Sequence, residues 1–497
     1  TTGTKNTLIG ASAGGSLTSG GENVAIGHAA LGLEDANGKN VAIGKSALAA
    51  QNAGAEAYNV AIGYEGGKQI TTGVENTIIG GLSGDALTTG QRNTALGTYA
   101  LGADTTGQYS VAIGRGALMS QNFTGGEASY NVAVGYDAGN DITTGTNNTL
   151  VGALAGDALT TGSKNTAMGI GALGSEDTGS RNTALGYGAL GLLNYDGDGY
   201  NTAVGYEAGA AMTTGVFNTI IGDIAGDALT TGAANVAIGY QALSLEDTHG
   251  HNVAIGFQSL ANQNAGANAY NVAIGSNAGL SVTTGVENTL IGGLAGDALT
   301  TGTYNVAIGY AALSTEDGHG KNVAIGYRSL TSQDAGSNAY NVAIGFDSGR
   351  LISTGGQNTI IGGLAGDALT SGDNNTALGY STLGAETLGD RNVAIGNFAL
   401  QVQNNTSNAD VYNTAVGFAA GGSITTGIQN TLIGGLAGDA LTTGSYNIAL
   451  GYSALSSEDA NGRNVAIGYF ALYSQNAGVD AYNIAIGHSA GQAITTA

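Results

Sequence analysis

The sequence contains no Cys, no Pro and no Trp in 497 residues. Without Cys there is neither a disulfide framework nor thiol chemistry. Without Pro, every residue keeps the backbone N–H that a hydrogen-bonded sheet requires. Basic residues are also scarce, with 13 Lys and Arg against 36 Asp and Glu and a net charge of −23. This balance argues against nucleic-acid binding and adsorption to anionic membranes, and predicts mutual repulsion between copies.

Gly is abundant, at 89 residues, but follows no Gly-X-Y period, which argues against a collagen-like triple helix. The sequence shows no signal peptide and no apolar run of transmembrane length. The sequence is repetitive, as described in the next paragraph, and residues 1–3 occupy the same place in the repeat as residues 495–497. We therefore expect an excerpt from a longer protein or a subunit that joins end to end, with any anchor, cap or tip domain outside it.

A five-residue phrase repeats along the whole chain. It reads Asn, then Thr, Val or Ile, then a small or aliphatic residue, then an aliphatic residue, then Gly, and occurs 28 times, once with Ser110 in place of Asn. Of the 27 intervals between phrases, 20 are 17 residues, five are 19 and two are 21, and the longer interval comes once in every four phrases. Such self-similarity predicts a solenoid, continuous over residues 1–497, with seven super-periods of four coils that start near residues 6, 76, 148, 218, 288, 358 and 430.

Each phrase is short, β-branched and bounded by Asn and Gly, which indicates a strand followed by a turn. A coil of 17 residues leaves no room for a crossover helix, so we predict an all-β fold, a parallel β-solenoid of 28 coils. In each coil we expect a second short strand, carried by segments such as 85–89 and 240–243.

Both faces of the phrase strand are apolar. Position four is a large aliphatic residue in all 28 coils and position two is Thr, Val or Ile, so alternation places these two on one face. Position three, on the other face, is Ala in 21 coils and Leu or Ile in the first coil of each super-period. A strand that is apolar on both faces is buried on both faces.

One face fits the interior of its own coil, and the Ala stripe fits close approach of identical chains. We therefore predict a homo-oligomer whose axis is lined by position three, at Leu8, Ala25, Ala42, Ala61, Ile78, Leu150, Ile220, Ala254, Ala273, Leu290, Ile360 and Leu432. Lys at Ala254 and Ala273 should then block assembly. The alternative is a wide monomeric coil in which both faces point into one large core.

The phrases Asn23–Gly27 and Asn40–Gly44 resemble the head repeats of trimeric autotransporter adhesins of the YadA type. Asn201–Tyr206 is similar to the Asn-Thr-Ala-Val-Gly-Tyr repeats of phage tail-fibre-like and bacterial surface proteins. The resemblance covers essentially the whole chain and implies a left-handed parallel β-roll, three chains about one axis, and a place on a cell surface or virion. The longer coils and the four-coil super-period depart from that family, and no coiled-coil stalk, membrane anchor or fibre chaperone is present in the sequence.

The extra residues of each super-period fall in its third coil and end on a Tyr just before the next phrase. We expect these loops to form a ridge, called here the tyrosine ridge, at Tyr58, Tyr130, Tyr200, Tyr270, Tyr340, Tyr412 and Tyr482. It could be a contact surface for glycans or neighbouring fibres, because Tyr joins a large apolar face to a polar tip. The favoured interpretation is structural: each Tyr covers the widened coil and bonds a loop carbonyl.

Two columns of acidic residues repeat along the chain. One runs through the second coils as the pairs Glu34-Asp35, Glu176-Asp177, Glu246-Asp247, Glu316-Asp317 and Glu458-Asp459, with Asp104 and Glu386 standing alone in the remaining two. Another runs through the first coils, at Asp85, Asp157, Asp227, Asp297, Asp367 and Asp439. Ca²⁺ is conceivable there, but copies four coils apart, roughly 19 Å at the usual strand spacing, cannot share an ion. We expect solvated turns with Asp capping local N–H groups, and no metal or other cofactor.

Two polar residue types complete the repeat analysis. The phrase Asn residues are expected to form a ladder of side-chain amides. The five histidines, at positions 28, 249, 251, 319 and 488, show no metal-ligand spacing and are expected on the surface.

No nucleophile–base set and no phosphate loop is evident, so we predict a protein that is not an enzyme. The favoured function is the structural shaft of an extracellular homotrimeric fibre or filament, whose partner is itself, with end-to-end polymerisation possible. One alternative is an adhesin or tail-fibre region that binds a receptor or cell-surface glycan along the tyrosine ridge. Another is a monomeric ice-binding solenoid, although position two alternates irregularly between Thr and Val.

Overall fold

The structure is a computed structural model that describes residues 2–407 and 409–496. Residues 1 and 497, which belong to the matched ends noted above, lie outside the described residues, as does residue 408. The chain divides into two compact units, Thr1–Gly250 and His251–Ala497. Each unit is an all-β parallel β-solenoid, which confirms the predicted fold class. The described residues form no helix, and so none that is long and apolar enough to cross a membrane.

Every coil contains one three-residue strand, which begins directly after the first residue of a phrase. The first unit holds β1 (Thr7–Ile9), β2 (Val24–Ile26), β3 (Val41–Ile43), β4 (Val60–Ile62), β5 (Thr77–Ile79), β6 (Thr94–Leu96), β7 (Val111–Ile113), β8 (Val132–Val134), β9 (Thr149–Val151), β10 (Thr166–Met168), β11 (Thr183–Leu185), β12 (Thr202–Val204), β13 (Thr219–Ile221) and β14 (Val236–Ile238).

The second unit repeats the pattern. It holds β15 (Val253–Ile255), β16 (Val272–Ile274), β17 (Thr289–Ile291), β18 (Val306–Ile308), β19 (Val323–Ile325), β20 (Val342–Ile344), β21 (Thr359–Ile361), β22 (Thr376–Leu378), β23 (Val393–Ile395), β24 (Thr414–Val416), β25 (Thr431–Ile433), β26 (Ile448–Leu450), β27 (Val465–Ile467) and β28 (Ile484–Ile486).

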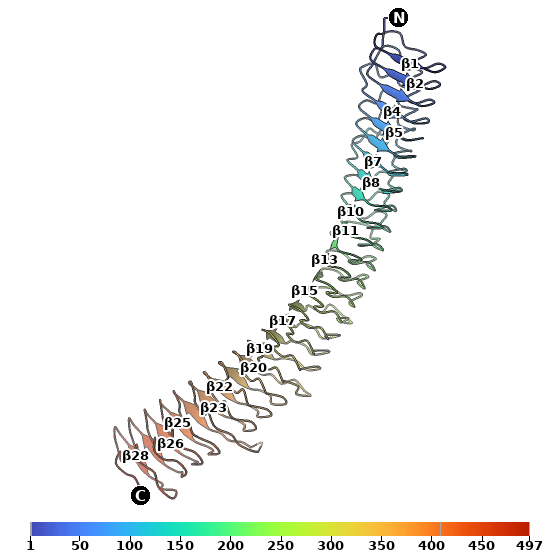
Figure 1. The fold of residues 1–497 in the computed structure, drawn as a ribbon. Helices are drawn as coiled ribbons and strands as arrows, with labels where there is room; N and C mark the ends of the chain where they lie inside the picture. The colour runs from blue at the N-terminus through green and yellow to red at the C-terminus, as the bar shows by residue number, and fades with distance from the viewer. Residues whose placement is uncertain (1, 408, 497) are drawn as a thin grey trace. The chain divides into compact units, whose positions relative to one another are not determined.

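Within each unit the strands stack in chain order, and each pairs in parallel with the next (Figure 1). Every phrase position lies opposite the same position of the neighbouring coil. For example, Val272, Ala273 and Ile274 pair with Thr289, Leu290 and Ile291. The longer intervals leave this register unchanged, because the additional residues are accommodated in the loops of the third coils.

The predicted second strand is wrong. Residues 85–89 and 240–243 form turns instead, in which left-handed residues such as Gly84 and Leu243 interrupt any extended run. Their backbone still bonds to the next coil: the N–H of Gly84 donates to the carbonyl of Ala100 at 2.9 Å. A coil is therefore one short strand followed by a chain of turns, and both parts are hydrogen-bonded along the stack.

The predicted ladder of phrase Asn side chains is confirmed. The Oδ1 atom of Asn341 accepts the backbone N–H of Asn358, the next phrase Asn, at 2.8 Å. Its Nδ2 atom donates to the carbonyl of Gly355 at 2.7 Å. Equivalent bonds join neighbouring coils throughout both units, and the phrase Asn side chains are buried. The Oδ1 bond therefore joins successive strand starts, whereas the Nδ2 bond to a turn carbonyl is not made everywhere: the Nδ2 atoms of Asn40, Asn182 and Asn322 have no hydrogen-bond partner.

Position three faces the interior of its own coil, so its assignment to an intermolecular axis is wrong. The axis residues proposed above are 0% exposed within the single chain, apart from Leu8, which is 44% exposed because β1 has a neighbouring strand on one side only. The buried residues are Ala25, Ala42, Ala61, Ile78, Leu150, Ile220, Ala254, Ala273, Leu290, Ile360 and Leu432.

Steric complementarity inside the coil explains the bulky residue of every fourth phrase. Where position three is Leu or Ile, the residue six positions later is always Gly, whereas Leu stands there in the next two coils. A Cβ atom on Gly84 would lie 3.0 Å from Ile78 Cδ1 and 3.1 Å from Leu87 Cδ1. In the next coil, Ala95 leaves room for the buried Leu101. The Leu and Ile residues thus fill the solenoid core, as close packing of an interior demands.

Candidate functional site

Positions two and four of every phrase form the outward strand face, the surface left open once position three is buried. Position two is β-branched in all 28 coils, and position four is aliphatic. Side chains at position four stay partly exposed even though neighbouring coils cover their flanks: Leu96 is 42% exposed and Met168 45%. The outward strand face is therefore a continuous column of partly exposed aliphatic side chains, with Thr at position two in 13 of the 28 coils.

Two columns of large side chains border the outward strand face. One is position zero, the residue before each phrase, and the other is position six, the residue after its Gly. Together they hold 24 of the 30 Tyr and Phe residues in the chain. At position zero the backbone φ is between 50° and 66° in every coil, yet no Gly occurs there. Gly would adopt this left-handed conformation without strain, yet every residue at position zero carries a side chain. We infer that the side chain, and not the backbone conformation, decides which residues occur there.

Charge is distributed unevenly around the coil. Positions zero and six hold ten of the 13 Lys and Arg residues but only four of the 36 Asp and Glu residues. The rest of the coil surface therefore carries almost all of the negative charge. Two copies of this acidic chain repel each other least when their outward strand faces meet.

The tyrosine ridge is part of the position-zero column, and its rings are used by neighbours within the chain. The ammonium of Lys39 lies 5.1 Å from the ring centroid of Tyr58, and Tyr109 stacks on Tyr130 at 5.2 Å. In each of the seven cases the side chain one coil earlier covers one ring face, with a cation in five and an aromatic ring in two.

Three of the seven ridge hydroxyl groups bond carboxylates, whereas a bond to a loop carbonyl was expected. Tyr58 donates to Glu56 at 2.8 Å, and Tyr200 and Tyr412 contact Asp198 and Asp410 in the same way. One face of each ring is thus occupied within the chain, while the seven Tyr residues stay 44–63% exposed. The covered faces support the structural interpretation of the ridge.

Seven of the twelve carboxylates in the second-coil column are buried, at Glu34, Asp104, Glu176, Glu246, Glu316, Glu386 and Glu458, so their expected solvation is wrong. The adjoining Asp35, Asp177, Asp247, Asp317 and Asp459 are half-buried or exposed, as expected. All seven buried carboxylates are 0% exposed, and each accepts the backbone N–H three residues later at 2.7–3.3 Å. The predicted capping of local N–H groups is thereby confirmed for this column. The Asp column of the first coils is half-buried, for example at Asp85 and Asp297.

In six of the seven super-periods a buried Gln accepts a hydrogen bond from the next phrase Asn, and in two of these it also donates to the acidic column. The Nε2 atoms of Gln51, Gln263 and Gln475 have no hydrogen-bond partner. Gln121 donates to Asp104 at 2.6 Å and accepts from Asn131 at 2.9 Å. Gln403 does the same between Glu386, at 2.8 Å, and Asn413, at 2.8 Å. Buried polar networks of this kind specify one arrangement of a core when their members are satisfied.

The third super-period lacks the Gln. Its place is taken by Leu193, which is buried like the glutamines. Glu176 is left with backbone N–H donors, from Gly179 at 2.7 Å and Tyr195 at 3.3 Å. Burial raises the pKa of Glu176 from its ordinary 4.5 to about 7. The chain thus contains a natural comparison between an acidic site with a Gln partner and one without.

Replacement of Asn341 by Ala is expected to destabilise the adjoining coils by about 3 kcal/mol, since it leaves buried groups without partners. The change removes the acceptor of the Asn358 N–H and the donor to Gln333, a bond of 2.6 Å. Urea unfolding and hydrogen exchange of β20 and β21 measure the effect. Ser337→Ala, in an exposed loop of the same super-period, should change neither. Equal midpoints for the two variants would contradict a stabilising role for the ladder.

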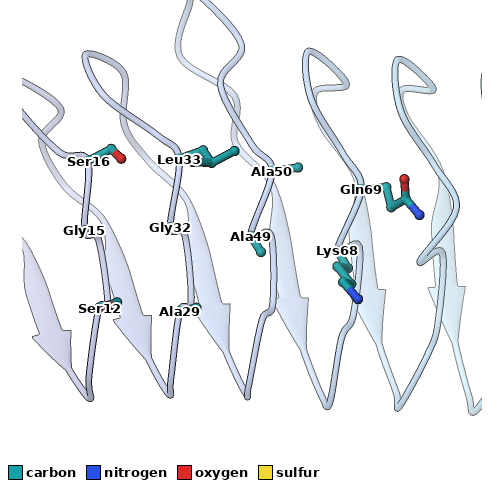
Figure 2. A pocket seen from close by; sticks show the side chains of 10 residues that line it. All are labelled: Ser12, Gly15, Ser16, Ala29, Gly32, Leu33, Ala49, Ala50, Lys68 and Gln69. Carbon is teal, nitrogen blue, oxygen red and sulfur yellow. The ribbon is translucent and has the colours of Figure 1, made fainter.

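An open groove lies across neighbouring coils of the first unit, away from the strands (Figure 2). Small residues such as Gly15, Ala29, Gly32 and Ala49 line most of it, and its volume is about 660 Å³. Of the lining residues, Lys68 alone carries a titratable group.

Sequence reasoning missed one relation among the histidines. His249 and His319 each follow a buried Glu by three residues, in the same coil of successive super-periods. The recurrence of Glu-Asp-x-His at an interval of 70 residues was the available signal. His251 does not share this place, and its ring stacks on Tyr270 with centroids 4.9 Å apart.

The chain was compared with known protein families and with curated proteins, and none of them matches it. The likeness of its phrases to fibre and adhesin repeats therefore stays a resemblance. The functional argument is carried by the geometry of the outward strand face and its two bordering columns.

Proposed function

We propose that the chain is the structural shaft of an extracellular homotrimeric fibre and acts without catalysis. One observation carries the proposal: position four of the outward strand face is a partly exposed aliphatic residue in coil after coil, and position two adds Val, Ile or Thr beside it. A solenoid that functions alone has no need to expose an aliphatic residue in every coil. A shaft built from several chains buries this surface between them.

The dimensions of the face support association. The seven residues from position zero to position six span at most roughly 20 Å, and coils stack about 4.8 Å apart, so the face of one unit has an area of at most on the order of 1,000 Å². A stable interface buries about 800 Å² on each partner. The scarcity of acidic residues in the bordering columns favours the same contact. Three features of the proposal rest on the resemblance of the phrases to fibre and adhesin repeats. They are the number of chains, the left-handedness of the solenoid and the location on a cell surface or virion.

The two alternatives have less support. Glycan stacking along the tyrosine ridge would have only one face of each ring to use, because neighbouring side chains cover the other face. Ice binding needs a regular lattice of hydroxyl groups, and position four of the outward strand face is aliphatic in every coil. The fibre shaft is therefore the function that we propose.

Light scattering after gel filtration tests the proposal. We expect a mass of three times 48.6 kDa, or larger species if trimers join end to end. Lys at three outward positions of the second unit, Ile274, Ile308 and Ile344, should reduce the mass to that of a single chain. The coils should stay folded, because these side chains are partly exposed and a Lys head can reach solvent.

The control places three Lys residues in exposed loops of the same unit, at Ala267, Ser337 and Thr406. It adds the same charge but should leave the mass unchanged. A wild-type chain that runs as a monomer would overturn the proposal. An outward variant that keeps the wild-type mass would show that the strand face is not the interface, and a change in the control alone would place the interface on the loops.

A further inference from the structure

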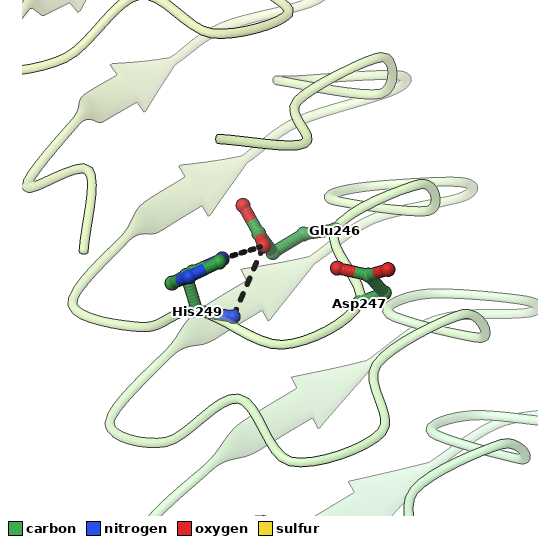
Figure 3. Close-up of side chains that lie close together, drawn as sticks. All are labelled: Glu246, Asp247 and His249. Carbon is green, nitrogen blue, oxygen red and sulfur yellow. Dashed lines mark hydrogen bonds and ion pairs between the residues drawn. The ribbon is translucent and has the colours of Figure 1, made fainter. Parts of the chain in front are cut away.

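Two of the seven buried carboxylates of the acidic column lie beside an imidazole. They belong to the clusters Glu246, Asp247 and His249 in the first unit and Glu316, Asp317 and His319 in the second. In both clusters, one ligand atom from each residue lies within 4.8 Å of the other two. Figure 3 shows the first cluster, with the Glu246 carboxylate directed at the ring and backbone of His249 and Asp247 on the following turn. Among the described residues, these are the two groups with such an arrangement.

The distance between the imidazole nitrogen and the Glu carboxylate oxygen is close to the distance between two ligand atoms of one metal ion. The Nδ1 atom of His319 lies 3.5 Å from Oε1 of Glu316, and the equivalent distance from His249 to Glu246 is 3.6 Å. Tetrahedral bonds of 2.0–2.1 Å to Zn²⁺ put two ligand atoms about 3.4 Å apart. Asp317 has an exposed side chain, so a rotation brings its carboxylate into range without disturbing the core.

The second cluster also contains two buried atoms that lack a hydrogen-bond partner. They are Oε2 of Glu316, whose side chain is 0% exposed, and Nδ1 of His319. Buried polar atoms are nearly always satisfied, so each such exception calls for a partner. In the first cluster Nδ1 of His249 already has one, the hydroxyl of Thr248 at 2.9 Å, whereas Gly318 stands at the corresponding place in the second.

We propose that Glu316, Asp317 and His319 bind a divalent first-row transition-metal ion, with Zn²⁺ the best match, and that Glu246, Asp247 and His249 form a weaker copy of the site. One imidazole and two carboxylates suit Zn²⁺ better than Ca²⁺, which prefers oxygen ligands alone. Solvent reaches the cluster beside His319, whose side chain is 33% exposed, and supplies the remaining ligand. The site would join the turn of one coil to the solenoid core.

The surroundings hold the ligands in place. Oε1 of Glu316 accepts the backbone N–H of His319 at 3.0 Å, which fixes the carboxylate next to the ring. The carbonyl of Asp317 accepts the backbone N–H of Thr300 in the preceding coil at 2.5 Å. Support of this kind raises the affinity of a metal site, because less order is lost on binding.

The chain itself supplies conservative variants for the test. In the other five super-periods the place of the His is taken by Asn37, Gly107, Gly179, Gly389 and Asn461. His319→Asn and His249→Asn therefore reproduce residues that already fit this turn. His251→Asn is the matched control, because His251 is a neighbour of the first cluster that does not belong to it.

The experiment is a calorimetric titration of the untagged full-length chain with Zn²⁺, followed by Co²⁺ absorption spectroscopy. We expect two saturable Zn²⁺ sites of unequal affinity. His319→Asn should remove the tighter site and His249→Asn the weaker one, each weakening binding at its own site by at least about tenfold. His251→Asn should bind like the wild type, and Ca²⁺ should not compete.

Circular dichroism and thermal unfolding in EDTA should be the same for all four proteins, which separates lost ligands from lost structure. The absence of saturable Zn²⁺ binding to the wild type would overturn the proposal. So would a His319→Asn variant that binds Zn²⁺ like the wild type. These outcomes do not depend on the oligomeric state, so they leave the fibre proposal untouched.

Discussion

Lys at Ala273 is expected to unfold the coils on either side of it, and not merely to separate chains. Ala273 is 0% exposed, and it pairs with Ala254 in β15 and Leu290 in β17. The space beside it is closed, because even a Cβ atom on Gly279 would lie 2.7 Å from Leu290 Cδ1. An ammonium group placed there has neither room nor a partner, so we expect a cost of at least about 4 kcal/mol.

The damage should remain local, because each coil of a solenoid contacts only its neighbours. Hydrogen exchange of peptides from β15 to β18 measures it, with peptides from β25 to β28 as an internal reference. The control is Ile274→Lys, one residue away on the outward strand face, where exchange should stay native. Native exchange in Ala273→Lys, together with loss of assembly, would return position three to an intermolecular axis.

The second large effect is a gain of stability in mild acid. The pKa of Glu176 is about 7 in the folded chain, against an ordinary value of 4.5, because burial disfavours the charged form. Folding therefore carries no ionisation cost at this site below pH 4.5, and the cost grows as the pH rises to about 7. A difference of this size corresponds to on the order of 3 kcal/mol.

Other carboxyl groups act in the same direction. Desolvation raises the pKa of each of these groups: Glu34, Asp85, Asp104, Asp157, Asp227, Asp297, Glu316, Asp367, Asp439 and Glu458. Glu56 and Glu65 have a lowered pKa because of hydrogen bonds from Lys39 and Lys68, but both are on the surface, where such pairs contribute little. We expect the melting temperature to rise when the pH falls from 8 to 5.

Leu193→Gln isolates the contribution of Glu176 from the general relief of repulsion among acidic groups. The new amide can donate to Glu176, as Gln121 donates to Asp104, and so lower its pKa. We expect the variant to be more stable than the wild type at pH 8 and equally stable at pH 5. Thermal unfolding at both values measures the difference. A parallel shift of the two proteins across this range would mean that Glu176 does not govern the pH dependence.

The repeat made the solenoid and its parallel register predictable from the sequence. The interval between phrases identifies the coils, and the Asn at the head of each phrase identifies the ladder. The interior was assigned to the wrong face, because both strand faces are apolar and alternation alone cannot rank them. The decisive signal was also in the sequence: Gly follows six residues after Ile78 and Leu150, whereas Leu follows at that distance after Ala95 and Ala167. A large residue at position three is thus paired with Gly, and the small residue of the next two coils with Leu. Side chains compensate for each other's size in this way when they pack in the same core.

The buried acidic column was unpredictable for a different reason. Glu34 and Glu176 lie in segments rich in Gly, Asp and Asn, whose composition indicates solvated turns. Burial depends on where the turn folds back over the core, and local sequence does not encode that path. The Gln side chains that bond these carboxylates, such as Gln121, lie in the next coil, 17 residues away. Only the stacking of coils brings the two together.

The columns of stacked rings give the protein a spectroscopic reporter of its own coil spacing. Tyr310, Tyr327 and Phe346 occupy successive coils, with ring centroids 5.6 and 5.3 Å apart and planes within 16° of parallel. With no Trp in the chain, the near-ultraviolet signal comes from Tyr and Phe alone. Rings held this close couple their electronic transitions, and the coupling fades as soon as adjacent coils separate. Near-ultraviolet circular dichroism can therefore register the opening of single coils without any attached label.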